Sequence, residues 1–460
     1  MSSPPATRLI RLNARDNEPV SEPQAEEREM CCENGDNGRA KSLGSMPSIA
    51  QLDADMPLEH SIQLPIELWE KVIDVLADEW VDVLWRDVPY EARLRVLGRV
   101  CRGWYARCRF RTCERLDVHR MDKTEVYHLI NKLNQDTKRC HAIRTVSFHF
   151  QGKSMSIFGT FAVCMAQKLP SVKHLLLRGC EWEPRQLHAQ VFVHITLAFE
   201  SVRMLELERV RVPSAVVFGR LLRALPRLSS LKCWDVSFNK HSDVAGRIWK
   251  LYPLRLDAAE MVGSDDVVDF LILIGAQLSH LPRYARSLEK CQELLRVTAE
   301  SLSSLHIELL GLISTLGFPS DLPIDLTPAV NLRVFSISLY LKNLHKAAMV
   351  LSRAFLPKLT EITIVLIPHS TRALFSSIIR NTLNEVDKDS YALLDQVFSS
   401  RQYPALKRVT FKLHCHTRRS EVMEVISEES WGSHFASSLP VVHASGRLAS
   451  FVSVQVEELV

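Results

Sequence analysis

The segment PSVKHLLLRG, residues 170–179, contains the pattern that decides the fold. Val172, Leu175 and Leu177 place apolar residues at the first, fourth and sixth positions of a short window. Leu175 and Leu177 lie two residues apart, so on a strand they face the same side and predict one buried face. Pro170 stands two residues before the pattern and stops the helix-like stretch Ile157–Leu169. The segment therefore predicts a helix, a proline turn and a short strand.

The same apolar pattern recurs after residue 142, and nine of its matches form a series. Successive starts lie 29, 30, 26, 23, 51, 30, 27 and 47 residues apart, and most of these intervals are close to the leucine-rich-repeat period of about 20–29 residues. Each of the two long intervals has room for a degenerate repeat or an insertion. The matches are Ile143/Val146/Phe148, Val172/Leu175/Leu177, Val202/Leu205/Leu207, Leu228/Leu231/Cys233, Leu251/Leu254/Leu256, Leu302/Leu305/Ile307, Leu332/Phe335/Ile337, Leu359/Ile362/Ile364 and Leu406/Val409/Phe411.

A proline also stands two residues before three further matches, at Pro226, Pro357 and Pro404. Stacked units of helix, proline turn and strand predict an α/β solenoid with parallel strands on one side and helices on the other. The asparagine that usually follows the strand in leucine-rich repeats is mostly absent, so we expect irregular repeats. A conventional α/β domain with the same order of elements is the alternative.

The long intervals and the C-terminal segment lead to separate predictions. Gly263–Glu300 is expected to form longer helices, with Leu271, Ile274 and Leu278 on one face. In the second interval, Ser376–Tyr403, the apolar stretch Tyr391–Phe398 predicts a helix. We expect the solenoid to span residues 113–430 and residues 431–460 to form a C-terminal cap.

The N-terminal residues 1–58 differ from the rest of the chain in composition. They include no aromatic residue, and ten carboxylates stand against six Arg and Lys residues. Such a segment cannot bury enough apolar surface to offset the entropy of ordering. The sequence therefore predicts a disordered acidic tail.

A short helical module is predicted over residues 59–112, beginning with LPIELWEKVIDVL at residues 64–76. Ile66, Trp69, Ile73 and Leu76 recur at helical spacing, and Leu68, Val72 and Val75 form a second apolar row beside them. A second helix is expected at about residues 89–97, and a third with Val100, Trp104 and Cys108 on one face. These helices have more apolar surface than so small a segment can bury. The alternative is a plain helical cap on the following domain.

The two ends of this module resemble an F-box. That family opens with a Leu-Pro-x-Glu helix and ends with a Val-Cys-x-x-Trp helix, and this chain has LPIEL at residues 64–68 and VCRGW at residues 100–104. The module is most similar to the F-box-like proteins of mushroom-type fungi, which typically carry degenerate leucine-rich repeats behind the box. The 23 residues between the two ends, Ala77–Arg99, are longer and more charged than the middle of the family's box.

The resemblance implies a substrate-receptor adaptor of an SCF-type cullin–RING ubiquitin ligase. The box would bind a SKP-family adaptor, and through it a cullin scaffold, while the repeats would bind an unknown protein substrate. A leucine-rich-repeat interaction scaffold unconnected to ubiquitin is the alternative. Residues of the module that would contact the adaptor, or form the core beneath it, are Leu64, Pro65, Ile66, Leu68, Trp69, Val72, Val100 and Trp104.

The sequence gives no positive support for an enzyme, a cofactor or a metal site. There is no Gly-rich phosphate loop, no G-x-S-x-G and no H-x-x-x-H beside a glutamate. His414, Cys415 and His416 alternate in direction on a strand and cannot close a tetrahedral metal site. We interpret Asp265 and Asp266 as a favourable charge pair at a helix N-terminus.

Charge and composition favour an intracellular protein, cytoplasmic or nuclear, with neither a membrane nor a nucleic acid as partner. The net charge is only +4, and no apolar stretch reaches the roughly 20 residues of a membrane span. We expect the scattered cysteines to be reduced and mostly buried. A cluster of basic residues has two interpretations. It could bind an acidic partner or nucleic acid, or it could be a solvated helix face and a linker, which the lack of interleaved aromatic residues favours. The cluster comprises Arg102, Arg107, Arg109, Arg111, Arg115 and Arg120.

Overall fold

The computed structural model describes residues 65–79, 90–150, 155–183, 186, 188–239, 253–284, 288–309, 324–368, 388–415 and 427–454. All of them belong to one compact unit, Leu64–Val460. The predicted acidic tail at residues 1–58, Leu64, residues 80–89 of the charged middle of the box, and His416 lie outside the described residues.

The central element of this unit is a thirteen-stranded sheet, and every described strand pair in it is parallel. Strands follow one another in the sheet in chain order, except that β6 pairs with β4. We call the segment from β1 to β13 the repeat array. The strands are β1 (Arg115–His119), β2 (Thr145–His149), β3 (His174–Glu181), β4 (Met204–Val212), β5 (Ser230–Trp234), β6 (Ser237–Phe238), β7 (Arg255–Val262), β8 (Gln277–Tyr284), β9 (Ser304–Glu308), β10 (Val334–Tyr340), β11 (Glu361–Ile367), β12 (Arg408–Cys415) and β13 (Leu448–Val454).

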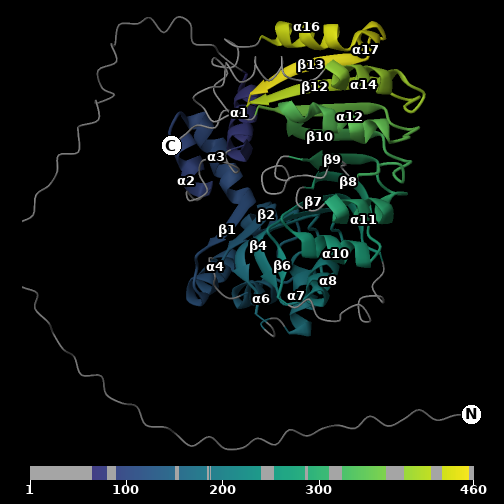
Figure 1. Cartoon of the computed structure of the whole chain (residues 1–460). Coiled ribbons are helices and arrows are strands. Elements are labelled where there is room, and N and C mark those ends of the chain that lie inside the picture. Colours follow the sequence, from purple (N-terminus) through teal and green to yellow (C-terminus); the bar gives the residue numbers. More distant parts are fainter. Residues whose placement is uncertain are drawn as a thin grey trace, which may run out of the picture. The chain divides into compact units, whose positions relative to one another are not determined.

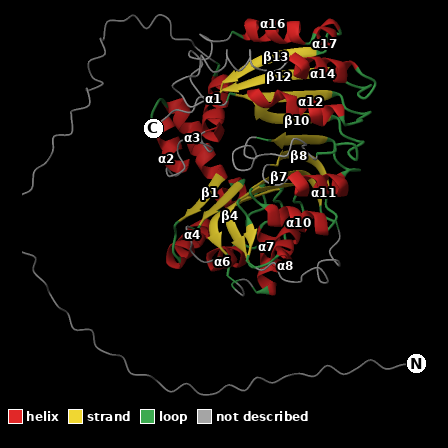
Figure 2. Cartoon of the chain, viewed as in Figure 1, coloured by secondary structure: helices red, strands yellow, loops and turns green. Residues whose placement is uncertain are grey.

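Helices connect most of these strands and lie along one face of the sheet, as Figures 1 and 2 show for α10, α11, α12 and α14. This α/β arrangement of a parallel sheet with helices is consistent with the predicted leucine-rich-repeat-like solenoid. The helices of the array are α4 (Lys123–Gln135), α5 (Thr137–Ala142), α6 (Ser156–Cys164), α7 (Ala189–Ala198), α8 (Ala215–Arg223), α10 (Asp265–Leu273), α11 (Leu288–Thr298), η2 (Leu341–Asn343), α12 (Leu344–Ser352), α14 (Lys388–Ser399), α16 (Glu428–Ser438) and α17 (Pro440–Ala444).

Each of the nine predicted matches overlaps a strand or immediately precedes it, and the register explains why the pattern repeats. Leu175 on β3 stands opposite Val146 on β2 and Leu205 on β4. Two residues on, Leu177 stands between Phe148 and Leu207 in the same way. Side chains of one row therefore stack on the same row of the next strand, and all six are fully buried. Apolar burial along these rows holds successive repeats together.

Two details of the first long interval were predicted wrongly. Leu278 lies on strand β8 instead of on a helix face, because the helical stretch α10 ends at Leu273 and Gly275 takes a left-handed turn at φ 62°. The match beginning at Leu251 does not mark the residues that align with the other repeats. Leu231 on β5 pairs with Ala259 on β7, three residues after Leu256, so the aligned position is Ala259. Strand β8 adds a repeat between β7 and β9, so this interval contains a degenerate repeat, which was one of the two predicted possibilities.

A left-handed residue recurs five positions after the aligned start of several strands. Gly179, Arg209, Asp235 and Gly263 have φ values of 64°, 51°, 53° and 62°. Glycine and aspartate adopt this conformation at little cost. The next position, where leucine-rich repeats usually have asparagine, is buried in each of these repeats and holds Cys180, Val210, Val236 and Ser264. Ser264 alone of the four keeps a polar role, since its hydroxyl accepts the Val236 N–H at 3.0 Å.

The helical stretch predicted at Ile157–Leu169 is shorter than expected, since α6 ends at Cys164, whereas two other helix predictions agree with the structure. Tyr391–Phe398 lies within α14, and Asp265 and Asp266 occupy the first turn of α10 as expected. Asp266 has a further role, because its carboxylate accepts the Phe238 N–H at 2.6 Å. At the C-terminal end, Trp431 of α16 is buried and donates its indole N–H to the Phe411 carbonyl at 3.2 Å. Strand β13 then pairs in parallel with β12.

Candidate protein-docking site

Three helices precede the repeat array, and we call them the helical module: α1 (Ile66–Glu79), α2 (Tyr90–Leu97) and α3 (Arg102–Glu114). Their buried apolar cluster consists of Ile73, Leu94, Leu97 and Cys108. Leu76 and Trp104 are partly buried against it. Four buried residues make a very small core, and a segment of this size needs further contacts for stability.

The two tryptophans of the module lie against each other. The ring centroids of Trp69 on α1 and Trp104 on α3 are 5.5 Å apart with an interplanar angle of 55°. Both side chains are half-buried. Aromatic pairs at this distance stabilise the packing of the elements that carry them, so Trp69 and Trp104 connect the first and third helices while still presenting part of their surface to solvent.

One row of α1 remains uncovered. Leu68, Val72 and Val75 are spaced at i, i+4 and i+7, so they share one face of the helix, and they are 43%, 37% and 49% exposed. We call these three residues the α1 stripe. The neighbouring row, with Trp69, Ile73 and Leu76, faces the core. The two apolar rows predicted for this helix are therefore present, and the helices of the module cover one of them.

Exposed apolar side chains are concentrated in the module. Among the described residues, eight of the sixteen exposed large apolar side chains lie between residues 66 and 110. The other eight are distributed over the whole array. Single exposed apolar residues are common on protein surfaces, but a concentrated set marks an interaction surface. The module members are Ile66, Leu68, Val72, Val75, Val96, Val100, Tyr105 and Phe110.

The residues proposed from sequence to contact an adaptor fall into three groups. Pro65, Ile66 and Val100 are exposed, and Leu68 and Val72 lie together on the α1 stripe. Trp69 and Trp104 pair with each other and lie between core and surface. Leu64 lies outside the described residues. Sequence reasoning did not include Val75, Tyr105 and Phe110 among the contact residues, although Val75 was recognised in the same apolar row as Leu68 and Val72.

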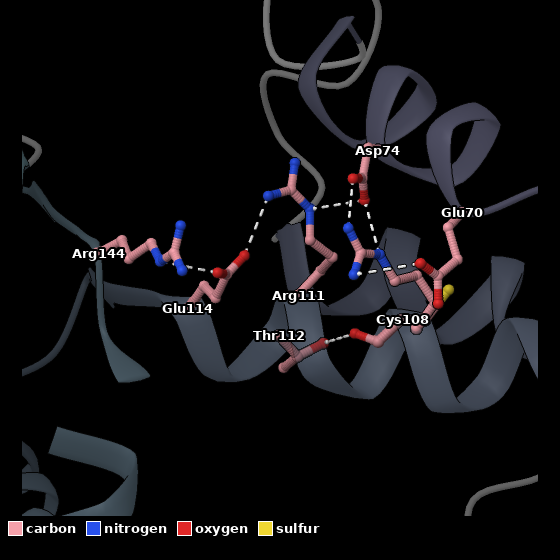
Figure 3. A network of polar contacts seen from close by, with 8 residues as sticks. Glu70, Asp74, Cys108, Arg111, Thr112, Glu114 and Arg144 are labelled. Carbon is pink, nitrogen blue, oxygen red and sulfur yellow. Dashed lines mark hydrogen bonds and ion pairs between the residues drawn. The ribbon is translucent and has the colours of Figure 1, made fainter. Parts of the chain in front are cut away.

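Ion pairs join α1 to α3 beside the small core, and Figure 3 shows them. Asp74 pairs with Arg107, whose Nε lies 2.9 Å from Asp74 Oδ1, and with Arg111, whose Nε lies 3.3 Å from the same oxygen. Glu70 lies 3.8 Å from Arg107 Nη1. The hydrogen bond that Arg107 donates to Asp74 raises the pKa of Arg107 above its ordinary value. Charge pairing thus supplies part of the stability that the apolar core does not.

The same network continues into the first repeat. Arg111 Nη1 lies 3.0 Å from Glu114 Oε2, and Arg144 Nε lies 2.9 Å from Glu114 Oε1 (Figure 3). The Arg144 N–H also donates to the Glu114 carbonyl at 2.7 Å. Glu114 is the last residue of α3, and β1 begins at the next residue. The module is therefore joined to the array through charged contacts and through continuous backbone.

The sequence did not predict this network, and the basic cluster was interpreted as a solvated helix face and linker or as a site for an acidic partner or nucleic acid. Arg107 and Arg111 instead pair with acidic side chains of α1, and Arg115 pairs with Asp117 at 3.0 Å. A signal was present: Glu70 and Asp74 are four residues apart on one helix, and Arg107 and Arg111 are four apart on another. Matched i, i+4 charges on two helices of one small module indicate a possible interhelical pairing.

The open face of the sheet, opposite the helices, carries a row of polar residues in its first half. Arg178 on β3 pairs with Glu208 on β4 at 2.5 Å, and Lys232 on β5 pairs with Glu260 on β7 at 3.6 Å. The rings of His119 and His149 lie 5.1 Å apart. Burial, and then the Arg178 charge, lower the pKa of His149 to about 4. This face can offer hydrogen bonds and charges to a bound protein.

Chemically reactive groups do not gather in the described part of the chain. No group of three or more His, Cys, Asp or Glu side chains there is placed to hold a metal ion. Burial raises the pKa of the Cys180 thiol to about 12 and also raises that of Cys108, so these thiols stay protonated. Within the same residues, no helix is long and apolar enough to cross a membrane.

Three comparisons place this chain beside known proteins. No family model matches the chain, and no curated protein matches it. Among solved structures, the chain is similar to the leucine-rich repeat-containing protein LegL7 from Legionella pneumophila, with 12% sequence identity over 75% of this chain and 90% of that one, at a TM-score of 0.37. The parallel sheet with helices described above is the arrangement that stacked repeats form.

Proposed function

We propose that this chain is a non-catalytic substrate receptor of an SCF-type ubiquitin ligase. In this proposal the helical module docks onto a SKP-family adaptor, which connects it to a cullin scaffold, and the repeat array holds a protein substrate. The F-box-like ends of the module, LPIEL at residues 64–68 and VCRGW at residues 100–104, suggest this assignment.

The observation that carries the proposal is the uncovered α1 stripe. Leu68, Val72 and Val75 lie on a helix whose other apolar row is already packed against the module core. Exposing a continuous apolar row costs free energy that an interface recovers, at about 25 cal/mol per Å² of apolar area buried. Trp69 and Trp104 border the core at the same place, and tryptophan is enriched among the residues that dominate interface energies.

The repeat array supports the substrate-binding half of the proposal. Stacked repeats provide an extended surface, and such surfaces bind proteins in other solenoids. Arg178, Glu208, Lys232 and Glu260 place alternating charges across neighbouring strands of the open face. A substrate with complementary charges would be positioned by these side chains.

A binding experiment with the full-length chain tests the proposal. Purified SKP-family adaptor should be retained by the immobilised wild-type chain. The double variant Leu68→Asp/Val72→Asp should lose this retention, because two carboxylates on the α1 stripe would be buried unpaired in the interface. Both side chains are exposed, so the variant should keep its melting temperature.

Val193→Asp is the matched control, since Val193 is an exposed valine on α7 of the array, 60% accessible to solvent. This variant should bind the adaptor as the wild type does. Equal retention of the adaptor by the wild type and by the double variant would show that the α1 stripe is not the docking surface.

The alternative is a repeat scaffold that binds proteins without any link to ubiquitin. The charged open face of the array favours this function as much as it favours substrate binding, because it does not involve the module. Failure of the wild-type chain to bind any SKP-family adaptor, together with recovery of protein partners by a chain carrying Leu68→Asp/Val72→Asp, would favour the scaffold.

A further inference from the structure

A pocket of about 510 Å³ lies on the other side of the helical module from its acidic–basic network, between α2, α3 and the start of α5. Its charged lining includes Arg95 and Arg99 from α2 and the turn after it, Arg109 from α3, and Arg139 from α5. The volume is in the range of sites for small molecules, roughly 300–1,000 Å³. We call it the arginine pocket.

The acidic residues at the arginine pocket do not neutralise these four arginines. Glu91 pairs with Arg95 at 3.5 Å, which accounts for one of them. The Asp136 carboxylate is engaged as the N-terminal cap of α5, where it accepts the Arg139 backbone N–H at 2.9 Å. Among the described residues, the side chains of Arg99, Arg109 and Arg139 have no ion-pair partner. The pocket thus keeps an excess of positive charge.

We propose that the arginine pocket binds the phosphate group of a small phosphorylated molecule. Guanidinium groups match phosphate oxygens in geometry, and a phosphate carries enough charge and oxygens for several of them at once, whereas one arginine satisfies a carboxylate. Arg99, Arg109 and Arg139 come from three separate segments, so the bound phosphate would also hold α2, α3 and α5 together. Leu94, Tyr105 and Cys108 line the remaining volume and provide an apolar wall for the organic part.

Calorimetric titration of the full-length chain with inorganic phosphate and with pyrophosphate tests this site. Both anions should bind at low ionic strength, and binding should weaken as salt increases. Arg109→Gln and Arg139→Gln should each weaken pyrophosphate binding by about tenfold or more, because each removes a charge-assisted hydrogen-bond donor. Arg109 has an exposed side chain, so its substitution should leave folding intact.

Arg102→Gln is the matched control, because Arg102 is an exposed arginine on the same helix and does not line the pocket. It should change pyrophosphate affinity by less than about twofold, as expected for a charge screened by solvent. Absence of binding by both anions at millimolar concentration would overturn the proposal. So would equal weakening by Arg102→Gln and Arg109→Gln, or binding of acetate as tight as that of pyrophosphate.

Discussion

The repeat array and the helical module bury their apolar side chains to different extents. In the array, rows such as Val146, Leu175 and Leu205 lie between neighbouring strands and beneath the helices, so each row covers the next. In the module, the buried apolar cluster has four members, and an entire helical row remains exposed. The array therefore buries its apolar rows with its own side chains, whereas the module leaves one apolar row exposed.

The two regions also use charge differently. Ion pairs of the module, centred on Asp74, join helices that share little apolar contact area. Ion pairs of the array, such as Arg178 with Glu208, lie on the open face above a core that is already closed. Removing a charge should therefore affect the module's stability more than the array's.

The largest effect is expected from the array core. Phe411 on β12 is fully buried and stacks on Phe435 with ring centroids 4.2 Å apart. Phe411→Ala should lower the free energy of unfolding by about 3–5 kcal/mol, through lost burial and the cavity that remains. Chemical denaturation followed by circular dichroism measures this change. Phe355→Ala, which truncates an exposed phenylalanine, should change the stability by less than about 0.5 kcal/mol.

Asp74→Asn should have the next largest effect, and it should be confined to the module. It leaves Arg107 and Arg111, both mostly buried, without their shared carboxylate. We expect a loss of about 2 kcal/mol in the free energy of opening of α1, less than for a fully buried pair because solvent partly screens these charges. Hydrogen exchange of the α1 amides should accelerate, while exchange in the array stays unchanged.

The control for Asp74→Asn is Glu67→Gln, since Glu67 is an exposed carboxylate on the same helix. Equal acceleration of exchange in the two variants would show that the network around Asp74 has no special role.

The open face of the array predicts a pH effect of intermediate size. Burial and then the Arg178 charge lower the pKa of His149 to about 4. The charge of Asp117 raises this pKa, whereas His119 and Arg115 lower it further. The unfolded chain then binds a proton near pH 6.5 that the native protein does not bind until about pH 4. Stability should be complete above about pH 6.5 and fall as the pH drops toward 4, by on the order of 1–2 kcal/mol after allowing for partial exposure.

His149→Gln should remove this part of the pH dependence, as measured by denaturation at a series of pH values. His128→Gln, at an exposed histidine on α4, should retain it. A wild-type stability that does not change between pH 6.5 and 4 would contradict the assigned environment of His149.

The smallest effect is expected from the α1 stripe. Leu68→Ala should change the stability by less than about 0.5 kcal/mol, because the side chain is already exposed. Leu94→Ala removes the same atoms from the module core and should destabilise the module by about 2–5 kcal/mol. Hydrogen exchange of the module's amides measures both changes. Similar losses in the two variants would mean that Leu68 is structural.

The sequence predicted the array better than the module because the apolar pattern of the array repeats, and each match can be checked against the others. Nine apolar matches at similar spacing supported one another, and the residues Val172, Leu175 and Leu177 have the burial that the pattern indicated. Strand β1 was missed although Cys113, Leu116 and Val118 form the same apolar pattern 30 residues before Ile143. Strand β8 was missed because it lacks a full match, and Leu278 fits a helical row and a strand equally well. Short apolar runs do not distinguish the two structures.

The candidate site depended on contacts between residues distant in the chain. Asp74 and Arg107 are 33 residues apart, and nothing in their local sequence requires them to meet. The arginine pocket combines residues from α2, α3 and α5, so its lining could not be predicted before the helices were placed. The α1 stripe was predictable, since a row at i, i+4 and i+7 is a local property of one helix.

Calorimetric titration of a purified SKP-family adaptor into the full-length chain at several temperatures tests the central claim that the α1 stripe is a docking surface. Burial of Leu68, Val72 and Val75 predicts tight binding with a negative heat-capacity change, both lost in Leu68→Asp/Val72→Asp and retained in Val193→Asp. Adaptor binding that is unaffected by the double substitution, or no binding by the wild-type chain, would contradict it.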